Sequence, residues 1–339
     1  MALRFVDSMS HYSTLLEKWD NTGEIPYVLT SSSPRRAGGK SVTPPNWYGA
    51  CLKILGNQST WIVGHAAKMM GGNESVATFW DGTTCKIQVT TNLDGTLRVN
   101  NGAWTLLGTS LAIPFNVWIF IEVKVVIHAS AGSVEIRVNG DTLLSISGVV
   151  TSSAGNAYAN LIGVGQPSGQ SGTAVSAADG QLHTDWYMCD GTGTTNNDFL
   201  GDCVVECLLP TGAGAESQWT PSAGSNYENV DEALANGDTD YNKSNTVGQV
   251  DTYAMADLVS ATGLIYGVQY VQYARKDNAG TRKIAGVARI GSADYPGNDI
   301  NLYDAYRVMM DIQEKSPSTA AAWTISEINA MEYGAKVTA

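Results

Sequence analysis

The sequence predicts an all-β protein of two tandem antiparallel β-sandwiches, and three observations support this prediction. Between Val117 and His128, apolar and mixed side chains alternate with a period of two, which is the period of a half-buried strand. Asn139-Gly140 and the Asp-Gly pairs at 81–82 and 94–95 are hairpin signals, because Asn and Gly tolerate a positive φ. The length of 339 residues is typical of about two domains.

The first domain is expected to span residues 1–209 and to contain most of the strands. An N-terminal strand at 2–6 precedes a predicted short helix, capped by Ser10, in which Tyr12, Leu15, Leu16 and Trp19 follow helical spacing. The polar, Gly- and Pro-rich segments 21–46 and 163–181 are interpreted as loops, the first with short extended pieces. Strands are expected at 51–55, 60–65, 76–80, 85–91, 96–100, in the long alternating pair around 117–138, at 182–190 and at 201–209.

The second domain is expected to span residues 210–339 and to be a smaller sandwich. The segment 210–225 is interpreted as a linker. Strand 266–276 has apolar bulk on both faces, which predicts a central strand. Thr324 and Glu327 form a capping box for a short C-terminal helix, whose apolar stripe is Ile325, Ile328 and Met331 and whose C′ residue is Gly334. Further strands are expected at 249–255, 282–290 and 303–314.

Composition narrows the classes of function. Hydrophobic residues make up 43% of the chain, enough for a sizeable core, whereas charged residues make up 15%, below the roughly 25% of ordinary soluble domains. A surface of Ser, Thr, Asn and Gly suits a crowded assembly or a fibre, and it also suits many secreted β-proteins. The net charge of −12 argues against direct nucleic-acid binding, which needs a basic patch. The local basic cluster of Arg35, Arg36 and Lys40 is interpreted as a solvated loop.

The sequence predicts neither a membrane span nor a secretory signal peptide. No segment approaches the ~20 apolar residues of a transmembrane helix. The first residues lack the apolar stretch of a signal peptide, and Asp7 comes early. We therefore expect a chain made in a cytoplasm, with no membrane partner.

Catalytic constellations are not evident in the sequence. A glycoside hydrolase of a β-sandwich fold needs two carboxylates across a cleft. The outward residues of the long strand pair, Glu122, Lys124, Glu135 and Arg137, are instead interpreted as cross-strand ion pairs on a solvated face. Serine catalysis has no support, and His11, His128 and His183 are expected to be surface or hydrogen-bonded packing residues, not catalytic bases. We predict no catalytic residue and no cofactor.

Calcium binding is a minor alternative at one polar connector. Its Asx residues supply the oxygen ligands that a hard cation prefers, but the same residues make local hydrogen bonds in turns, which we favour. The candidates are Asp190, Asn196, Asn197, Asp198 and Asp202, and a second, weaker set is Asp231, Glu232, Asp238 and Asp240. The five cysteines have irregular spacing without a CxxC motif, which predicts free thiols and no zinc site.

Aromatic residues allow a further alternative, a stacking platform for sugars. The first domain contains several aromatic side chains in or beside predicted strands, and core packing is the favoured role for most of them. The candidates are Trp47, Tyr48, Trp61, Trp80 and Trp104.

Parts of the sequence resemble known families. The long strand, short turn and strand ending in VNG at 138–140 resemble the laminin-G/concanavalin-A-like jelly roll, which implies that fold for residues 1–209. Three stretches are similar to a family of tailed-bacteriophage virion proteins. They are FVDSMSHYSTLLEKWD, DWYMCDGTGTTNNDFLGDCVVECLLPTGAGAESQWTPSAGSNYENVDE and WTISEINAMEYGAKV.

The virion resemblance implies a function without implying catalytic residues. We expect a non-enzymatic structural protein that decorates the phage head, collar or tail through contacts with other virion proteins. A carbohydrate- or receptor-binding module of a phage fibre is the alternative, and a glycan-degrading enzyme is a third possibility. Symmetric virion appendages and sheet edges that need cover favour a homo-oligomer, with a trimer as the first expectation.

Overall fold

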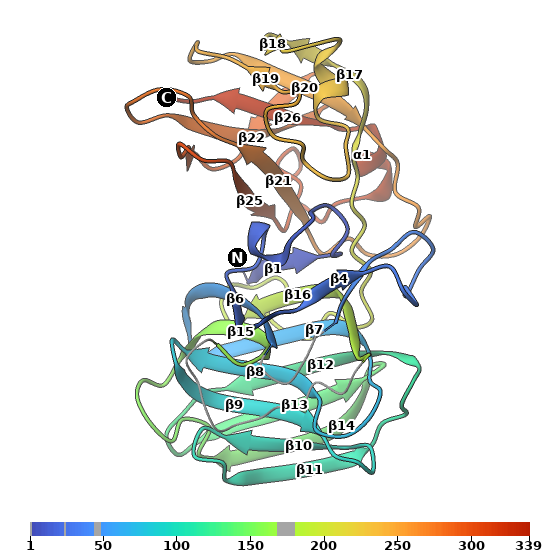
Figure 1. Cartoon of the computed structure of the whole chain (residues 1–339), viewed down its shortest axis with the longest axis vertical. Coiled ribbons are helices and arrows are strands. Elements are labelled where there is room, and N and C mark those ends of the chain that lie inside the picture. The colour runs from blue at the N-terminus through green and yellow to red at the C-terminus, as the bar shows by residue number, and fades with distance from the viewer. Residues whose placement is uncertain (1, 24, 44–48, 168–179) are drawn as a thin grey trace. The chain divides into compact units, whose positions relative to one another are not determined.

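The computed structural model describes residues 2–23, 25–43, 49–167 and 180–339 (Figure 1). The chain is nearly all β, with 49% strand and 4% helix, and its sheets are antiparallel but for one short parallel pair, which confirms the predicted fold class. It divides into two compact units, Met1–Val205 (unit 1) and Glu206–Ala339 (unit 2). The predicted boundary at Pro210 falls inside unit 2, because residues 206–209 belong to that unit. Among the described residues, no helix is long and apolar enough to cross a membrane.

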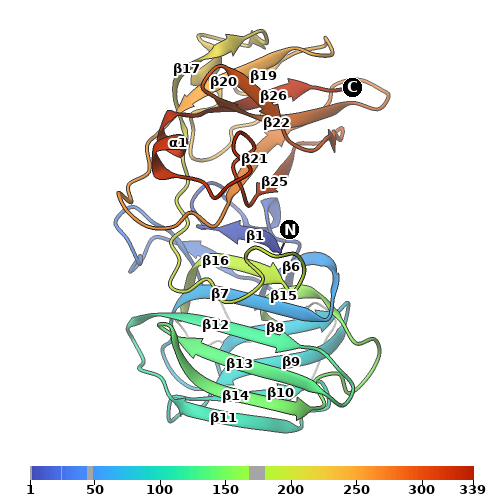
Figure 2. The same cartoon turned by 180° about the vertical axis from the view of Figure 1, so that it is seen from behind.

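Unit 1 is a sandwich of two sheets. Figure 1 looks onto sheet B and Figure 2 onto sheet A. Sheet A has the order β14-β13-β12-β7-β16-β5-β4, with β1 paired to β16. Its strands are β1 (Leu3–Asp7), β4 (Val28–Thr30), β5 (Ser41–Thr43), β7 (Thr60–Lys68), β12 (Trp118–Val126), β13 (Gly132–Val138), β14 (Asp141–Val149) and β16 (Leu182–Asp190).

Sheet B has the order β11-β10-β9-β8-β15-β6-β2, with β3 paired to β6. Four of its strands were not predicted. They are β11, β15 and the short β2 and β3, which lie in the segment 21–46 interpreted as a loop, and residues 163–165 of the other predicted loop end β15. The strands are β2 (Asn21–Gly23), β3 (Ile25–Pro26), β6 (Gly49–Gln58), β8 (Ser75–Asp81), β9 (Thr84–Thr91), β10 (Thr96–Asn101), β11 (Leu106–Ala112) and β15 (Ala159–Gly165).

The alternation that predicted the fold produces the core of unit 1. Ile121, Val123 and Val125 of β12 are buried, and they pair with buried residues of β7 and β13. Trp61 of β7 crosses between the sheets, and its Nε1 donates to the carbonyl of Ala159 in β15 at 2.9 Å. Each sheet therefore has one side facing this core and one outer face.

The predicted N-terminal helix is wrong. Only a 3-10 turn forms, at Leu15–Glu17 (η1), and it is capped by Thr14 instead of Ser10. The aromatic spacing reflects a buried polar cluster: the Tyr12 hydroxyl and the Trp19 Nε1 both donate to the Asp7 carboxylate, at 2.6 and 2.7 Å. The periodicity that resembled a helix thus arises from two side chains converging on one carboxylate.

Unit 2 is built on sheet C, whose order is β17-β20-β26-β22-β23, with β24 paired to β22. Its core combines Tyr270, Ala288, Trp323, Ile328 and Met331. The elements of sheet C are β17 (Pro210–Ser217), β20 (Val250–Met255), β22 (Lys283–Ile290), β23 (Ala293–Pro296), β24 (Ile300–Asn301) and β26 (Glu332–Val337). Outside it lie β18 (Thr220–Pro221) with β19 (Asn242–Lys243), β21 (Val268–Ala274) with β25 (Arg307–Gln313), the turn η2 (Asn226–Asn229) and the helix α1 (Ile325–Ala330).

Three assignments in this part of the chain were wrong. Residues 201–209 form no strand, whereas the predicted linker contains β17, which pairs with β20. The small residues of β17 serve this pairing, because a Cβ on Gly214 would lie 2.4 Å from the Thr252 carbonyl oxygen. Strand β21 is not central but pairs only with β25, and its second buried side arises where Tyr270 stacks on Tyr333 of sheet C at 4.6 Å.

The C-terminal helix is confirmed, but its end was misplaced. Thr324 caps α1, since its hydroxyl accepts from the Glu327 amide at 3.2 Å, whereas the Glu327 carboxylate accepts from Ser318. Gly334 is not the C′ residue but lies within β26. A Cβ there would lie 1.7 Å from the Asp251 carbonyl oxygen, so close approach of β20 requires glycine at this position.

Candidate functional site

The outer face of sheet B carries a row of polar side chains on three neighbouring strands. In the strand register Gln88 lies opposite both Thr78 and Asn100, and Arg98 lies opposite Thr90. Directly paired residues project from the same side of a sheet, so these side chains lie on one face, where all of them but the half-buried Arg98 are buried. We define the outer face of sheet B by Thr78, Trp80, Gln88, Thr90, Arg98 and Asn100.

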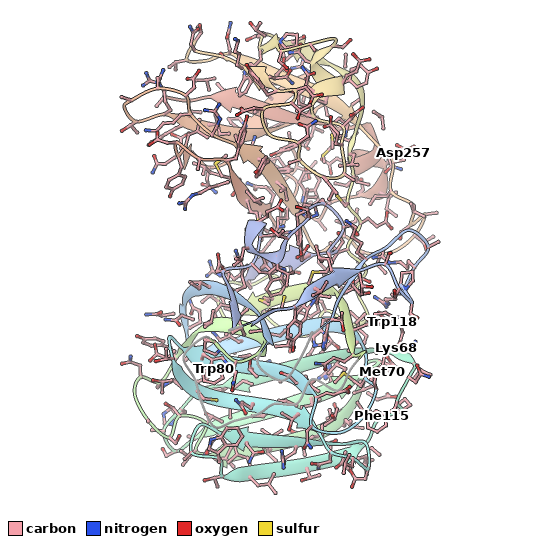
Figure 3. The ribbon with its side chains drawn as sticks, in the orientation of Figure 1. Lys68, Met70, Trp80, Phe115, Trp118 and Asp257 are labelled. Atoms are coloured by element: carbon pink, nitrogen blue, oxygen red, sulfur yellow. The ribbon has the colours of Figure 1, made fainter. Side chains whose placement is uncertain are left out.

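Several buried polar atoms of this face have no hydrogen-bond partner. Gln88 is 1% exposed, and neither its Oε1 nor its Nε2 is hydrogen-bonded. The Nε1 of Trp80 and the Nε of Arg98 are also buried and unpartnered (Figure 3 labels Trp80). Such atoms are uncommon in folded proteins, because each costs about 1–3 kcal/mol of desolvation. Four of the fifteen such atoms among the described residues lie on this face of sheet B.

The remaining side chains of the row fix the shape of the face. The Thr78 hydroxyl donates to the Gly165 carbonyl of β15 at 2.9 Å, and the Asn100 Nδ2 donates to the Trp104 carbonyl at 3.1 Å. The second bond holds the turn between β10 and β11, in which Trp104 has a φ of 63° and is 46% exposed. An exposed indole therefore stands at the rim of the polar row.

The aromatic residues predicted as a sugar platform lie in different parts of unit 1. Trp61 packs in the core, as expected for most of the group, whereas Trp80 lies on the outer face of sheet B and Trp104 at its rim. Trp47 and Tyr48 lie outside the described residues. Trp80 packs with Ala50, Leu52 and Leu161 in a buried apolar cluster.

A second aromatic group lies where β7 ends and β12 begins. Trp118 pairs with Lys68, the Asn116 amide donates to the Met69 carbonyl at 2.7 Å, and Figure 3 labels Met70 and Phe115 beside them. Met70 is exposed, Phe115 and Trp118 are half-buried, and the described residues of this group contain no buried, unpartnered polar atom. It therefore presents fewer unpaired polar groups to a ligand than the outer face of sheet B does.

The polar residues of the long strand pair on the outer face of sheet A bind one another or the chain around them. The prediction of Glu122 as part of a solvated ion-pair lattice is wrong: Glu122 is buried, and its carboxylate accepts from the Tyr187 hydroxyl and from the Gly201 amide at 2.8 Å. The Arg137 Nε instead donates to Glu135 on the same strand at 2.9 Å. Segment 198–205 thus covers this part of the sheet and shields Glu122 from solvent.

The predicted solvated basic loop is also wrong. Arg35 and Arg36 both pair with the buried carboxylate of Asp185, and the Val205 amide donates to the same group at 3.0 Å. Asp185 has a φ of 51°, which places its carboxylate between the two guanidinium groups. This cluster anchors the end of unit 1 and leaves neither arginine free for a phosphate.

In the first set of calcium candidates, the three aspartates form ion pairs with basic side chains of the chain itself. Asp190 pairs with Arg4, Asp198 with Lys124 at 3.0 Å, and Asp202 with Arg35. The remaining two lie in turns: Asn197 donates to the Gly193 carbonyl, and Asn196 has a φ of 55°.

Most of the second set of calcium candidates is also engaged by side chains of the chain itself. Asp238 pairs with Arg275, the Asn236 amide binds Glu232 and Asp240, and Asp231 is near Glu232. Among the described residues, no group of three His, Cys, Asp or Glu is placed to hold a metal ion, and all five cysteines are free thiols.

The histidines are mostly buried. His65 and His183 meet at 5.0 Å between ring centroids, with Trp186 stacked on His65. Burial lowers the pKa of both, that of His65 to about 4, and the Nε2 of His183 has no partner. His11 is also buried, with its pKa lowered to about 4, whereas the His128 Nδ1 accepts from turn amides.

Comparisons with known proteins locate no family. No known protein family and no curated protein matches the sequence. Among solved structures, domain 4 of the arabinanase AbnA from Geobacillus stearothermophilus has 14% identity and a TM-score of 0.33, covering 55% of this chain and 94% of that one. Alginate lyase Aly36B has 11% identity and a TM-score of 0.31, covering 52% and 95%. A SAP-like pentraxin of Limulus polyphemus has 14% identity and a TM-score of 0.30, covering 40% and 68%.

Proposed function

We propose that unit 1 binds a glycan on the outer face of sheet B. The observation that carries this proposal is the buried Gln88 amide, whose donor and acceptor both lack partners on a face that also holds unpartnered Trp80 and Arg98 atoms. Sugar hydroxyls are donors and acceptors that pair with amides, and sugar rings stack on exposed indoles such as Trp104. This was the alternative function predicted from the sequence.

The proposed activity is binding without turnover. The described positions of the outer face of sheet B carry no carboxylate and no imidazole, the groups that most often perform general acid–base catalysis. Glu122, the buried carboxylate of the opposite sheet, is engaged by Tyr187 and Gly201. Release of reducing ends from any bound polysaccharide would contradict this part of the proposal.

A glycan array probed with the full chain tests the proposal. We expect the wild-type protein to retain at least one glycan, and we expect Trp104→Ala to weaken that binding about three- to tenfold through loss of ring stacking. Trp118→Ala is the matched control, because it removes a partly exposed indole from the other sheet and should leave binding unchanged. Absence of any retained glycan, or equal loss in both variants, would overturn the assignment.

A second proposal concerns the setting of this binding. We infer from the three virion-like segments of the sequence that the chain decorates a tailed-phage particle, as a homo-oligomer that contacts other virion proteins. Mass spectrometry of gradient-purified particles is expected to find the chain at a stoichiometry set by particle symmetry. Its presence in the infected-cell lysate but not in the particles would contradict a virion role and leave glycan binding untouched.

A further inference from the structure

The outer face of sheet B holds an arginine without an acidic partner. Arg98 of β10 lies between Thr90 of β9 and Thr109 of β11, and it forms no ion pair with any described residue. Its Nε is buried and unpartnered. By contrast, Arg35, Arg36 and Arg137 of the same unit each bind a carboxylate. Although the chain has 32 acidic residues, the Arg98 guanidinium therefore keeps its charge available for an external anion.

The strand positions that surround Arg98 on this face are uncharged. None of the described positions of the outer face of sheet B is acidic, although the net charge of the chain is −12. Lys86, the neighbouring cation on β9, is already engaged, since its Nζ donates to the Ala154 carbonyl at 2.6 Å and lies 3.8 Å from Asp81. The free positive charge of the face therefore belongs to Arg98.

We propose that this site takes an acidic glycan, one that carries carboxylate or sulfate groups, with Arg98 as the residue that determines this specificity. The inference rests on the proposed function and deepens it. A guanidinium binds a carboxylate or sulfate through two parallel N–H···O bonds, which are stronger than neutral hydrogen bonds. Gln88, opposite Asn100 and diagonal to Arg98, supplies the neutral donor and acceptor for neighbouring hydroxyls.

Paired ligands separate charge from sugar identity. Polygalacturonate and hyaluronan are each compared with their carboxyl-reduced forms, and dextran sulfate with dextran, by titration into the full chain. We expect at least one acidic member to bind at least about tenfold more tightly than its neutral partner, as one charge-assisted contact implies. Arg98→Gln should make the two members of that pair bind equally, whereas Arg137→Gln, the matched change on sheet A, should keep the preference. Thermal melts confirm that both variants fold.

The outcomes of these titrations distinguish specificity for acidic glycans from glycan binding itself. If neutral members bind as well as acidic ones, or if Arg98→Gln keeps the preference, the inference fails and glycan binding stands. If neither these probes nor any glycan of the array binds, the proposed function fails together with it. A preference for dextran sulfate alone identifies sulfate as the recognised group, and a preference for a uronate identifies the carboxylate.

Discussion

Lowering the pH from 7 to 5 is expected to reduce the unfolding free energy of unit 1 by about 2 kcal/mol through His65 alone. Burial holds the pKa of His65 at about 4, below its ordinary value of 6.5. Between these values the unfolded chain binds a proton that the folded chain does not. The stabilisation is therefore complete above pH 6.5 and is lost as the pH falls towards 4. His183 acts in the same direction, because burial also lowers its pKa.

The geometry explains why neither ring accepts a proton. The His65 Nε2 donates to the Val76 carbonyl at 2.9 Å, which leaves its Nδ1 as the acceptor for the His183 Nδ1 at 3.4 Å. The only remaining nitrogen, the His183 Nε2, is buried without a partner, so its protonation would place an unpaired charge in the core.

Urea unfolding at pH 7, 6 and 5 measures this pH effect. His183→Leu is expected to give a shallower pH profile than the wild type, and His128→Gln, in an exposed turn, is the control that should reproduce the wild-type profile. Equal slopes for all three proteins between pH 7 and 5 would show that the paired histidines do not govern acid sensitivity.

Gln88→Leu is expected to stabilise the fold while it removes the amide of the proposed binding site. Leu is similar in volume to Gln and has no polar atoms, so the substitution relieves the buried, unpartnered amide and raises the unfolding free energy by about 1–3 kcal/mol. Gln58→Leu, at the half-buried end of β6, is the matched control and should change stability by less than about 0.5 kcal/mol. A gain of stability on loss of a side chain is typical of residues retained for function.

Local patterns predicted much of the fold. The strict alternation from 117 to 127 predicted β12 and its core face, and the Asp-Gly pairs predicted two turns in which Gly82 and Gly95 have φ values of 57° and 84°. The pattern failed where a long-range partner decides the outcome. Residues 210–217 resemble a linker, but they form a strand because β20 lies beside them.

The same distinction applies to the site. Alternating Lys86, Gln88 and Thr90 in the predicted strand 85–91 already marked a polar outer face, so the sequence contained a signal that the prediction did not use. That the Gln88 amide lacks partners could not be predicted, because it depends on the positions of β8 and β10. For the same reason the burial of Glu122, whose partners Tyr187 and Gly201 lie far along the chain, escaped prediction.

The central claim is that the outer face of sheet B keeps buried polar atoms unpaired in order to bind a glycan. Titration of the glycan identified on the array into wild type, Gln88→Leu and Gln58→Leu, with urea unfolding of the same three proteins, tests this most directly. The account predicts that Gln88→Leu alone loses at least about tenfold in affinity while it gains stability. Unchanged glycan affinity in Gln88→Leu would contradict it.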